Sequence, residues 1–364
     1  MVRLKIDNIE YKVPEGTTVF DAAKKAGIEI PTLCHKDGLP HYTSCFVCIV
    51  KNKNTDSYIP SCSALVQHNM DIDTSGEEVI AMRKKAIELL LLEHRAECEA
   101  PCRVVCPAGL NIPLMNRLIA AGNVEAAIEL SISEITGPEI MCTTCPGYCE
   151  NACRRKKVDV PVSIRNIQLF VSQSINKYKF IQNKDNQPYK VNQERIQKHK
   201  SGDINRRFSS RIGKLEKLEQ NEWLKECKEY TKRYREITGF DNALYETENC
   251  MHCDCRAAED CRLRDVAEEY SIKDPRGKIV SAQIEKKINQ QTGLIFENAK
   301  CIKCGLCVRI CEDNSENPSL CFLNRGFITI LSEPLTETFE NVLKTQSNEC
   351  IKICPTGALA HFKK

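Results

Sequence analysis

Several features that would identify common classes of protein are missing from this 364-residue chain. No two of its 16 glycines lie closer than ten residues, so neither a GxGxxG dinucleotide turn nor a GxxxxGK phosphate loop can be present. No apolar run approaches the roughly 18 residues of a membrane-spanning helix. The net charge of +3 gives no overall basic excess of the kind that nucleic-acid-binding proteins carry. The sequence therefore predicts a chain without a nucleotide pocket, a membrane span or a nucleic-acid partner.

Cysteine is the residue type that the chain has in excess. There are 23 cysteines, and nearly all of them fall into tight groups. The first residues, Met1 to Asp7, alternate charged and apolar groups and lack the apolar core of a secretory signal. We therefore expect a cytoplasmic protein, and in that reducing compartment thiols bind metal more often than they pair as disulfides.

The first cysteine set consists of Cys34, Cys45, Cys48 and Cys62. A CxxC pair supplies two thiolates from one turn of loop, and thiolates hold the iron of iron–sulfur clusters. Four cysteines can also hold one zinc ion. A hairpin is expected over residues 1–12, turning at Asp7-Asn8, and Thr18 is placed to cap a short helix over residues 19–26.

The surroundings of this set resemble a known domain. The stretches 30–34, 44–48 and 61–62, and 73–74 leading into 83–94, are similar to the N-terminal [2Fe-2S] domain of the large iron–sulfur subunit of complex I and of iron-only hydrogenases. The resemblance implies a β-grasp fold with one [2Fe-2S] cluster on the four cysteines. Phe46 stands where that family usually has arginine.

The second set begins after a long helix expected over residues 77–94. Two Cys-Pro steps, Cys106-Pro107 and Cys145-Pro146, stand on opposite arms of a helical hairpin predicted over residues 111–133 and broken at Gly122-Asn123. In two-cluster ferredoxins the cysteine before proline serves the other cluster, so this pattern predicts two cubane clusters that share ligands across the arms. A further helix is expected over residues 164–178.

Residues 94–175 resemble the N-terminal helical domain of the glutamate synthase small subunit and of dihydropyrimidine dehydrogenase. The matching stretches are 102–113, 121–127, 145–153 and 164–170. The resemblance implies one [4Fe-4S] cluster on Cys106, Cys145 and Cys149, with Gln168 at the position of a glutamine ligand. It implies a second cluster on Cys98, Cys102 and Cys153, for which His94 or Cys142 could be the fourth ligand; we favour His94. Gln168 could equally be an ordinary helix residue.

The third set, Cys250, Cys253, Cys255 and Cys261, places four thiols within twelve residues. Judged by the number of thiols alone, these cysteines could bind either one cubane cluster or one zinc ion, and we favour the cluster. The run after Cys261 resembles the segment that follows the [2Fe-2S] domain in the complex I and hydrogenase subunits, where a histidine and three cysteines bind a [4Fe-4S] cluster. Here residues 98–249 are inserted between the two parts, and His252 is spare.

The fourth set matches the pattern of a bacterial-type ferredoxin. Cys301, Cys304 and Cys307 follow one another at CxxCxxC spacing, and Cys354-Pro355 supplies the fourth ligand of a [4Fe-4S] cluster. A second ferredoxin cluster would need cysteines at Lys344 and Ser347, so we expect that cluster to be absent. Cys311, Cys321 and Cys350 then have no assigned role.

Residues 177–235 carry 17 Lys or Arg against 8 Asp or Glu and include no cluster motif. Residues 182–210 are polar and read as loop, whereas residues 215–234 keep helical spacing. We interpret the stretch as a solvated connection; a docking surface for an acidic partner is the alternative.

Together these patterns predict a multidomain α+β protein with one [2Fe-2S] and about four [4Fe-4S] clusters. The expected segments are a β-grasp domain (1–76), an all-α two-cluster domain (77–180), a basic linker and helix (181–245), a four-cysteine segment (246–295) and a ferredoxin-like domain (296–364).

The cysteines and the missing nucleotide motifs favour a non-catalytic electron-relay subunit. The resemblance implies a flavin- and NAD(P)-binding partner, a second acceptor such as ferredoxin, a reductase or a hydrogenase subunit, and a hetero-oligomer. One alternative is a zinc-stabilised scaffold or nucleic-acid-binding protein using residues 177–235. The other is an enzyme with substrate at an iron site ligated by His94 or Gln168.

Overall fold

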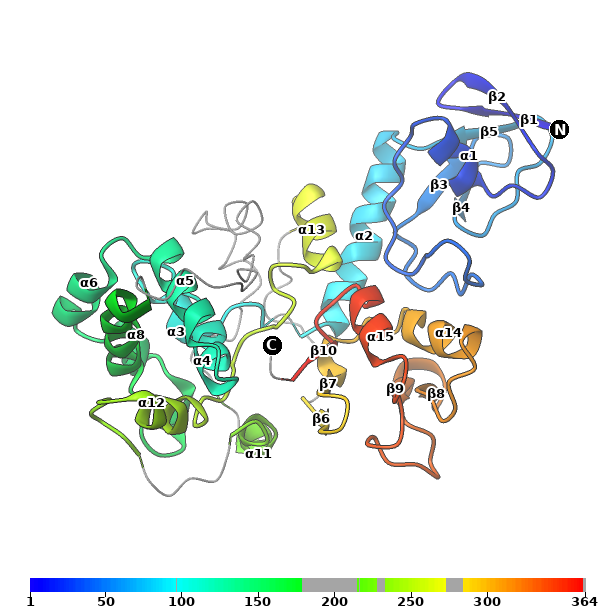
Figure 1. Ribbon diagram of the computed structural model, residues 1–364. Helices are drawn as coiled ribbons and strands as arrows, with labels where there is room; N and C mark the ends of the chain where they lie inside the picture. The colour runs from blue at the N-terminus through cyan, green and yellow to red at the C-terminus, as the bar shows by residue number, and fades with distance from the viewer. Residues whose placement is uncertain (96, 179–214, 216, 228–232, 273–283, 363–364) are drawn as a thin grey trace. The chain divides into compact units, whose positions relative to one another are not determined.

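The computed structural model describes residues 1–364 except 96, 179–214, 216, 228–232, 273–283 and 363–364 (Figure 1). The chain divides into two compact units. Unit 1 consists of Met1–Arg95, Cys261–Ala282 and Lys287–Leu359, and unit 2 of Ala96–Asp260, Gln283–Lys286 and Ala360–Lys364. In the sequence, residues 96–260 of unit 2 are inserted between two segments of unit 1.

Unit 1 begins with a five-stranded mixed sheet in the order β2-β1-β5-β3-β4. Strand β1 pairs antiparallel with β2 and parallel with β5, and β3 pairs antiparallel with both β4 and β5. The strands are β1 (Val2–Ile6), β2 (Ile9–Val13), β3 (Ile49–Asn52), β4 (Ser57–Pro60) and β5 (Met70–Asp73).

The local sequence explains the first elements. Asp7 and Asn8 take left-handed backbone angles, φ 49° and 71°, as a tight turn between two strands requires, so the hairpin expected there is confirmed. Helix α1 (Val19–Lys25) starts where predicted, because the Thr18 side chain accepts a hydrogen bond from the Asp21 N–H at 3.1 Å. The buried face of α1 joins the sheet core through Val19, Ala22 and Ala23.

Helix α2 (Glu77–Glu93) follows the sheet and confirms the predicted long helix. It buries Val79, Ile87 and Leu91, and it packs against α13 (Arg262–Glu269). Arg83 is also buried on α2, where its Nε donates to the Ile49 carbonyl at 3.1 Å and its Nη1 to the Tyr270 hydroxyl at 3.2 Å.

The C-terminal part of unit 1 is built from short elements around Phe296, Leu306 and Leu320, all buried. Strands β10, β7 and β6 form a three-stranded sheet, and β8 pairs antiparallel with β9. The elements are β6 (Lys286–Asn289), β7 (Leu294–Glu297), η3 (Asn298–Lys300), α14 (Leu306–Asp313), β8 (Cys321–Leu323), η4 (Gly326–Ile328), β9 (Ile330–Ser332), α15 (Ser347–Ile353) and β10 (Leu359–His361).

The described part of unit 2 is helical. Helix α5 contacts both α4 and α8, and α12 also contacts both, around a core that includes Met115, Ile119, Ala127, Ile167 and Val171. The break predicted at Gly122-Asn123 separates α4 from α5, with Asn123 capping α5. The elements are α3 (Pro101–Val104), α4 (Ile112–Ala120), α5 (Val124–Glu134), α6 (Pro138–Thr144), α7 (Tyr148–Asn151), η1 (Arg154–Lys157), α8 (Ile164–Tyr178), η2 (Lys217–Glu219), α11 (Gln220–Leu224) and α12 (Phe240–Thr247).

The basic stretch is only partly described. The prediction of loop over residues 182–210 falls outside the described residues. In the second half, α11 ends at Leu224 and Tyr234 lies outside a helix, so the helix is shorter than its spacing indicated. Trp223 of α11 is buried. Farther along the chain, the Tyr234 backbone N–H donates to the Glu246 carboxylate at 3.0 Å, and this bond takes the place of a helical hydrogen bond.

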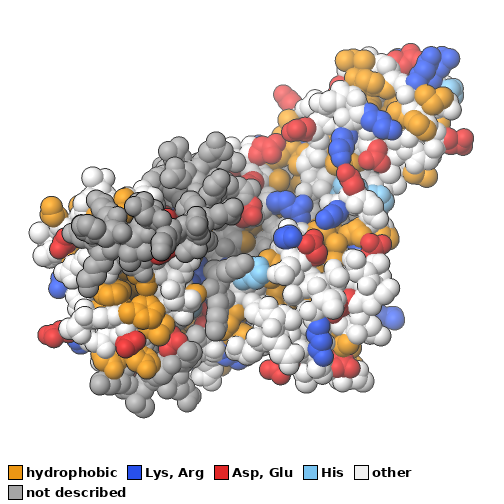
Figure 2. Space-filling view, in the orientation of Figure 1, with side chains coloured by type: hydrophobic (Ala, Val, Ile, Leu, Met, Phe, Trp, Pro, Cys, Tyr) orange, Lys and Arg blue, Asp and Glu red, His pale blue; other side chains and the backbone are white. Residues whose placement is uncertain are grey.

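The surface mixes charges of both signs. On the face drawn in Figure 2, Lys and Arg side chains are interspersed with Asp and Glu among the described residues. None of the described helices is long and apolar enough to cross a bilayer. The structure is a mixed helix-and-sheet, multidomain protein, as predicted; the finer boundaries remain predictions.

Candidate iron–sulfur sites

The first cysteine set is brought together in unit 1. Cys34, Cys45, Cys48 and Cys62 are all buried, and their thiols interact in pairs: Cys34 with Cys45 and Cys62, and Cys48 with Cys62. The thiols of Cys45 and Cys62 hold the pKa of Cys34 well below its usual value, and Cys62 lowers the pKa of Cys48 to about 7. The same contacts raise the pKa of Cys45 and of Cys62, so the group holds two thiols that ionise readily and two that do not. Four converging sulfur donors of this kind suit a rhombic two-iron centre.

Backbone geometry presents these sulfurs. Phe46 takes a left-handed conformation with φ 54°, which turns the chain within the Cys45–Cys48 loop and leaves the Phe46 ring half exposed. The Ser61 hydroxyl donates to the Cys48 carbonyl at 2.7 Å and so ties the loop to the strand end that carries Cys62.

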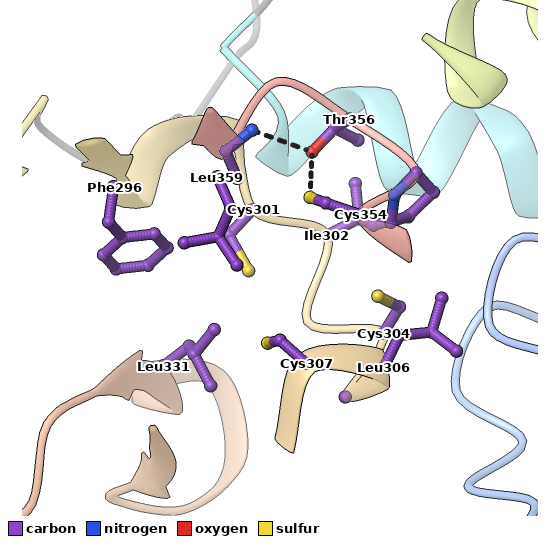
Figure 3. Close-up of a pocket in the computed structure, with 13 residues that line it drawn as sticks. Phe296, Cys301, Ile302, Cys304, Leu306, Cys307, Leu331, Cys354, Thr356 and Leu359 are labelled. Carbon is purple, nitrogen blue, oxygen red and sulfur yellow. Dashed lines mark hydrogen bonds between the residues drawn. The ribbon is translucent and has the colours of Figure 1, made fainter. Parts of the chain in front are cut away.

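The fourth set also converges in unit 1, around a closed cavity. Figure 3 shows the Cys301, Cys304, Cys307 and Cys354 side chains around one space that is closed by apolar side chains such as Phe296 and Leu331. The turn relies on left-handed residues at Lys303 (φ 54°) and Gly305 (φ 71°). The Lys303 backbone N–H donates a hydrogen bond to the Cys301 sulfur at 3.3 Å. Burial raises the pKa of Cys301 to about 12, so thiolate here needs a compensating positive charge such as iron.

The lining of this cavity suits a cluster. Four thiols surround it, and most of its other walls are apolar. Four thiolate donors around one such volume are the arrangement that a cubane requires.

One arginine connects the first and fourth sets. Arg309 is buried on α14, and its Nη2 donates to the Cys34 carbonyl at 2.6 Å and to the Cys304 carbonyl at 3.2 Å. Its Nη1 donates to the Pro40 carbonyl, and the Tyr42 ring lies 4.7 Å from the guanidinium. The backbones of two predicted ligands thus share one guanidinium. Nothing in the spacing of the sequence indicated this role for Arg309.

The cysteines without an assigned role do not join these sites. The Cys311 and Cys350 sulfurs lie 3.7 Å apart in a fully buried position, and Cys321 is on β8. All 23 cysteines are free thiols in the structure.

In unit 2, Cys106, Cys145 and Cys149 interact with one another. Burial raises the pKa of Cys149 to about 12, and Glu150, Cys106 and Cys145 add to the rise. Cys142 is close enough to Cys106 and Cys145 to be affected in the same way, with burial as the larger cause and a pKa of about 11. The structure therefore offers a fourth thiol beside the three predicted ligands.

Gln168 is the other candidate for that fourth position. It is fully buried on α8, its amide nitrogen donates to the Ser131 hydroxyl, and its amide oxygen has no hydrogen-bond partner. A buried unpartnered oxygen is costly in free energy unless something binds it. The donor chemistry of this oxygen fits the predicted role as an iron ligand.

The remaining cysteines of unit 2 are grouped across the predicted sets. Cys102 and Cys153 of the second set line one cavity together with Cys250 and Cys253 of the third. Cys98 and Cys255 do not line it; the Cys255 N–H donates to the Cys98 carbonyl at 3.1 Å. Cys261, the last member of the third set, belongs to unit 1.

His94 also belongs to unit 1, at the end of α2. Its Nδ1 lies 2.9 Å from the Lys300 carbonyl, and burial lowers the pKa of the imidazole to about 4. It is therefore neutral at pH 7, which is the form that binds metal.

A buried ion-pair network lies in the same unit as the cavity of Cys102. Glu226 is fully buried and pairs with both Arg256 and Lys286. Burial alone would raise the pKa of Glu226, but the two cations outweigh it and hold the pKa well below its usual range. Lys286 also lies 3.9 Å from the centre of the Trp223 ring, and Arg154 5.1 Å from it.

Comparison with known families supports the two N-terminal assignments. Residues 1–77 match the family described as 2Fe-2S iron-sulfur cluster binding domain, and residues 93–180 match dihydropyrimidine dehydrogenase domain II, 4Fe-4S cluster. The resemblances to these domains are thereby confirmed.

Similar curated proteins include the NADPH-Fe(3+) oxidoreductase subunit alpha of Geobacter sulfurreducens, 34% identical over 34% of this chain and 14% of that protein. NADP-reducing hydrogenase subunit HndD of Solidesulfovibrio fructosivorans is 38% identical over 27% of this chain and 18% of that protein. A subunit of the NADH-quinone oxidoreductase of Rickettsia bellii is 34% identical over 34% and 17%. The chain thus spans less than a fifth of the length of these relatives.

A solved structure is similar in fold. A chain in the crystal structure of an NAD+-reducing [NiFe]-hydrogenase in the H2-reduced state aligns with 99% of this chain and 87% of its own length, with a TM-score of 0.50 and 15% identity. By sequence, this chain is similar to parts of subunits of NADPH-Fe(3+) oxidoreductase, NADP-reducing hydrogenase and NADH-quinone oxidoreductase, and its fold is similar to that of a chain of an NAD+-reducing hydrogenase.

Proposed function

We propose that this chain is the iron–sulfur electron-relay subunit of a cytoplasmic NAD(P)H-linked flavoprotein oxidoreductase complex. The partner's flavin takes two electrons with the hydride of NAD(P)H, and this chain accepts them one at a time. It passes each electron to a second acceptor, such as ferredoxin, a reductase or a hydrogenase subunit. The hydride transfer takes place on the partner's flavin, and this chain only accepts and passes on single electrons, so it is not itself the catalyst.

The observation that carries the proposal is the contact of Arg309 with both ligand loops of unit 1. The guanidinium joins the Cys34 and Cys304 carbonyls, so a path of covalent and hydrogen bonds connects the first and fourth sets. The Ser44 hydroxyl adds a second link, since it donates to the Cys304 carbonyl at 3.4 Å. A chain that merely stores metal has no need for two centres joined in this way, whereas a relay requires it.

The donor sets support one [2Fe-2S] and several [4Fe-4S] clusters. Cys34, Cys45, Cys48 and Cys62 would hold the two-iron centre in a β-grasp domain, and Cys301, Cys304, Cys307 and Cys354 a cubane in a ferredoxin-like domain. Cys106, Cys145 and Cys149 would hold another cubane, with Gln168 as the fourth ligand. When bound, these clusters supply one-electron redox chemistry; the surrounding chain excludes water and sets their potentials through burial and hydrogen bonds.

Anaerobic purification of the native complex, and of the full chain expressed alone, tests the proposal. We expect brown protein with iron and sulfide for about five clusters, which co-purifies with a flavoprotein and reduces no NAD(P) alone. Isolated chain that reduced NAD(P) unaided would overturn the relay. Colourless protein with zinc only would support the scaffold alternative, and substrate-dependent changes in one cluster's spectrum would support the enzyme alternative.

A further inference from the structure

Unit 2 contains a second four-cysteine cavity whose ligands neither matched family assigns. Cys102 lies on α3 and Cys153 follows α7, whereas Cys250 and Cys253 come about one hundred residues later and fall outside both matched segments. All four line one cavity, whose other walls include apolar residues such as Ile112 and Val162. From this juxtaposition we propose that Cys102, Cys153, Cys250 and Cys253 together ligate one [4Fe-4S] cluster.

Comparison with the ferredoxin cavity of unit 1 is the first argument. Both cavities have a volume of about 20 Å³, and both are lined by four cysteines together with apolar side chains. The cavity of unit 2 therefore has the size and the donor set of its counterpart in unit 1.

Asn116 supplies the second argument. It lines the same cavity from α4 and is fully buried, yet neither its amide nitrogen nor its amide oxygen makes a hydrogen bond of normal geometry. A buried amide in the wall of a cavity, with neither its donor nor its acceptor satisfied, is placed to bind a group inside that cavity.

A cluster in the cavity would explain this amide as well as the four thiols. Leaving an amide unpartnered in a core destabilises the folded state. An amide N–H beside a cluster has acceptors in the cluster's sulfur atoms and in the thiolates that hold it. We assign Asn116 as a positioning residue that donates to the cluster.

Charge at the cavity provides the third argument. A [4Fe-4S] centre with four thiolates is anionic, and a buried anion needs cationic neighbours. Arg154 lines the cavity and is buried, and its Nη1 pairs with Glu97 at 2.9 Å. Arg155 also lines it, and its Nη1 donates to the Asn249 carbonyl at 3.3 Å, next to Cys250. The two arginines directly after Cys153 thus bring positive charge to the side of the proposed cluster.

Single and double alanine variants of the full chain, purified anaerobically, test the ligand set. Cys102→Ala, Cys250→Ala and the double variant should each lose about four irons and the same electron paramagnetic resonance signal, because all of them remove one cluster. Cys98→Ala and Cys255→Ala should retain that signal, and Cys321→Ala is the control that loses no iron. Two different signals lost by Cys102→Ala and Cys250→Ala, or about eight irons lost in the double variant, would overturn the proposal.

The Asn116→Leu variant gives a readout that does not depend on folding of a ligand variant. It should keep all its iron and shift the midpoint potential of the Cys102/Cys250 signal alone, since one hydrogen bond to the cluster is removed. An unchanged potential would overturn the role of Asn116. The inference rests on the proposed function only in assuming that the chain binds iron. Wild-type protein without iron would refute both, whereas iron-replete wild type with unrelated losses would refute only this ligand set.

Discussion

The two four-cysteine cavities are alike in size and lining but differ in how the chain builds them. In unit 1, Cys301, Cys304 and Cys307 come from one turn and only Cys354 from a distance. In unit 2, three separate segments supply Cys102, Cys153 and the pair Cys250 and Cys253. A local site needs a correct turn, whereas a dispersed site needs a folded domain to bring its parts together. The proposed cluster of unit 2 should therefore stabilise its surroundings more strongly.

Among the changes that distinguish the two four-cysteine cavities, removal of iron should have the largest effect on stability. A cross-link between residues about one hundred positions apart contributes roughly 4 kcal/mol in the chain-entropy estimate, and loss of the unit 2 cluster removes such a link. Trp223 is the only tryptophan and is buried in unit 2, so its fluorescence reports on that unit. Anaerobic urea titrations before and after chelation should differ by at least about that amount. If the urea transitions of the Trp223 fluorescence before and after chelation coincided, the dispersed site would be contradicted.

The next largest effect on stability is expected from the ion pairs of Glu226, and we expect it in unit 2 only. Glu226→Gln leaves Arg256 and Lys286 buried without their counter-charge, a loss of about 3–5 kcal/mol. Because the folded-state pKa of Glu226 is lowered, its contribution is complete above about pH 5 and is lost as the pH falls toward the folded-state value. The variant should thus show a shallower fall in stability below pH 5, followed by Trp223 fluorescence.

The control for this charge effect is Glu125→Gln, which removes an exposed carboxylate from the same unit. It should leave both the stability and its pH dependence within about 0.5 kcal/mol of the wild type. Equal pH profiles for Glu226→Gln and the wild type would show that the buried pairs do not govern acid stability.

The same contrast explains what could be read from the sequence. Helices α1, α2 and α8 were predictable because Thr18 marks a cap and the apolar spacing is regular. The fourth cysteine set was predictable because its turn is local. The grouping of Cys102 with Cys250 was not, since it depends on how helices pack over about 150 intervening residues. Asn116 and Gln168 could not be told apart from ordinary helix residues, because only packing reveals which of their amide atoms lack partners.

Arg309 offers a way to weaken unit 1 without touching a ligand. Arg309→Met removes donors from the Cys34, Pro40 and Cys304 carbonyls and should cost about 3 kcal/mol, because hydrogen bonds from a charged group are the stronger kind. Arg309→Lys should recover only part of the loss, since one ammonium cannot span three carbonyls. Anaerobic denaturation followed by visible absorbance measures the effect.

The exposed Arg325 provides the matched control for that experiment. Arg325→Met should be neutral within about 0.5 kcal/mol. In Arg309→Met, electron transfer between the two centres of unit 1 should also slow, measured by rapid-freeze spectroscopy after reduction. If the Arg309→Met protein had the stability and the electron-transfer rate of the wild type, the contact of Arg309 with both ligand loops would no longer support the proposed relay.

The smallest expected effect concerns the turn that presents Cys304. Gly305 has φ 71°, and a Cβ there would lie 2.6 Å from Cδ2 of the Tyr42 ring, whereas Gly293 has φ 67° with no atom within 4 Å of its Cβ position. Both Gly→Ala changes carry the cost of a left-handed backbone, about 1–2 kcal/mol, but only Gly305→Ala adds a clash. Gly305→Ala should therefore exceed Gly293→Ala by about 1 kcal/mol, and Tyr42→Ala should abolish that excess in a double-mutant cycle. Equal costs in the wild-type background would mean that the Tyr42 ring moves aside freely, so that the contact between the two ligand loops depends on Arg309 and Ser44 and not on the packing of Tyr42.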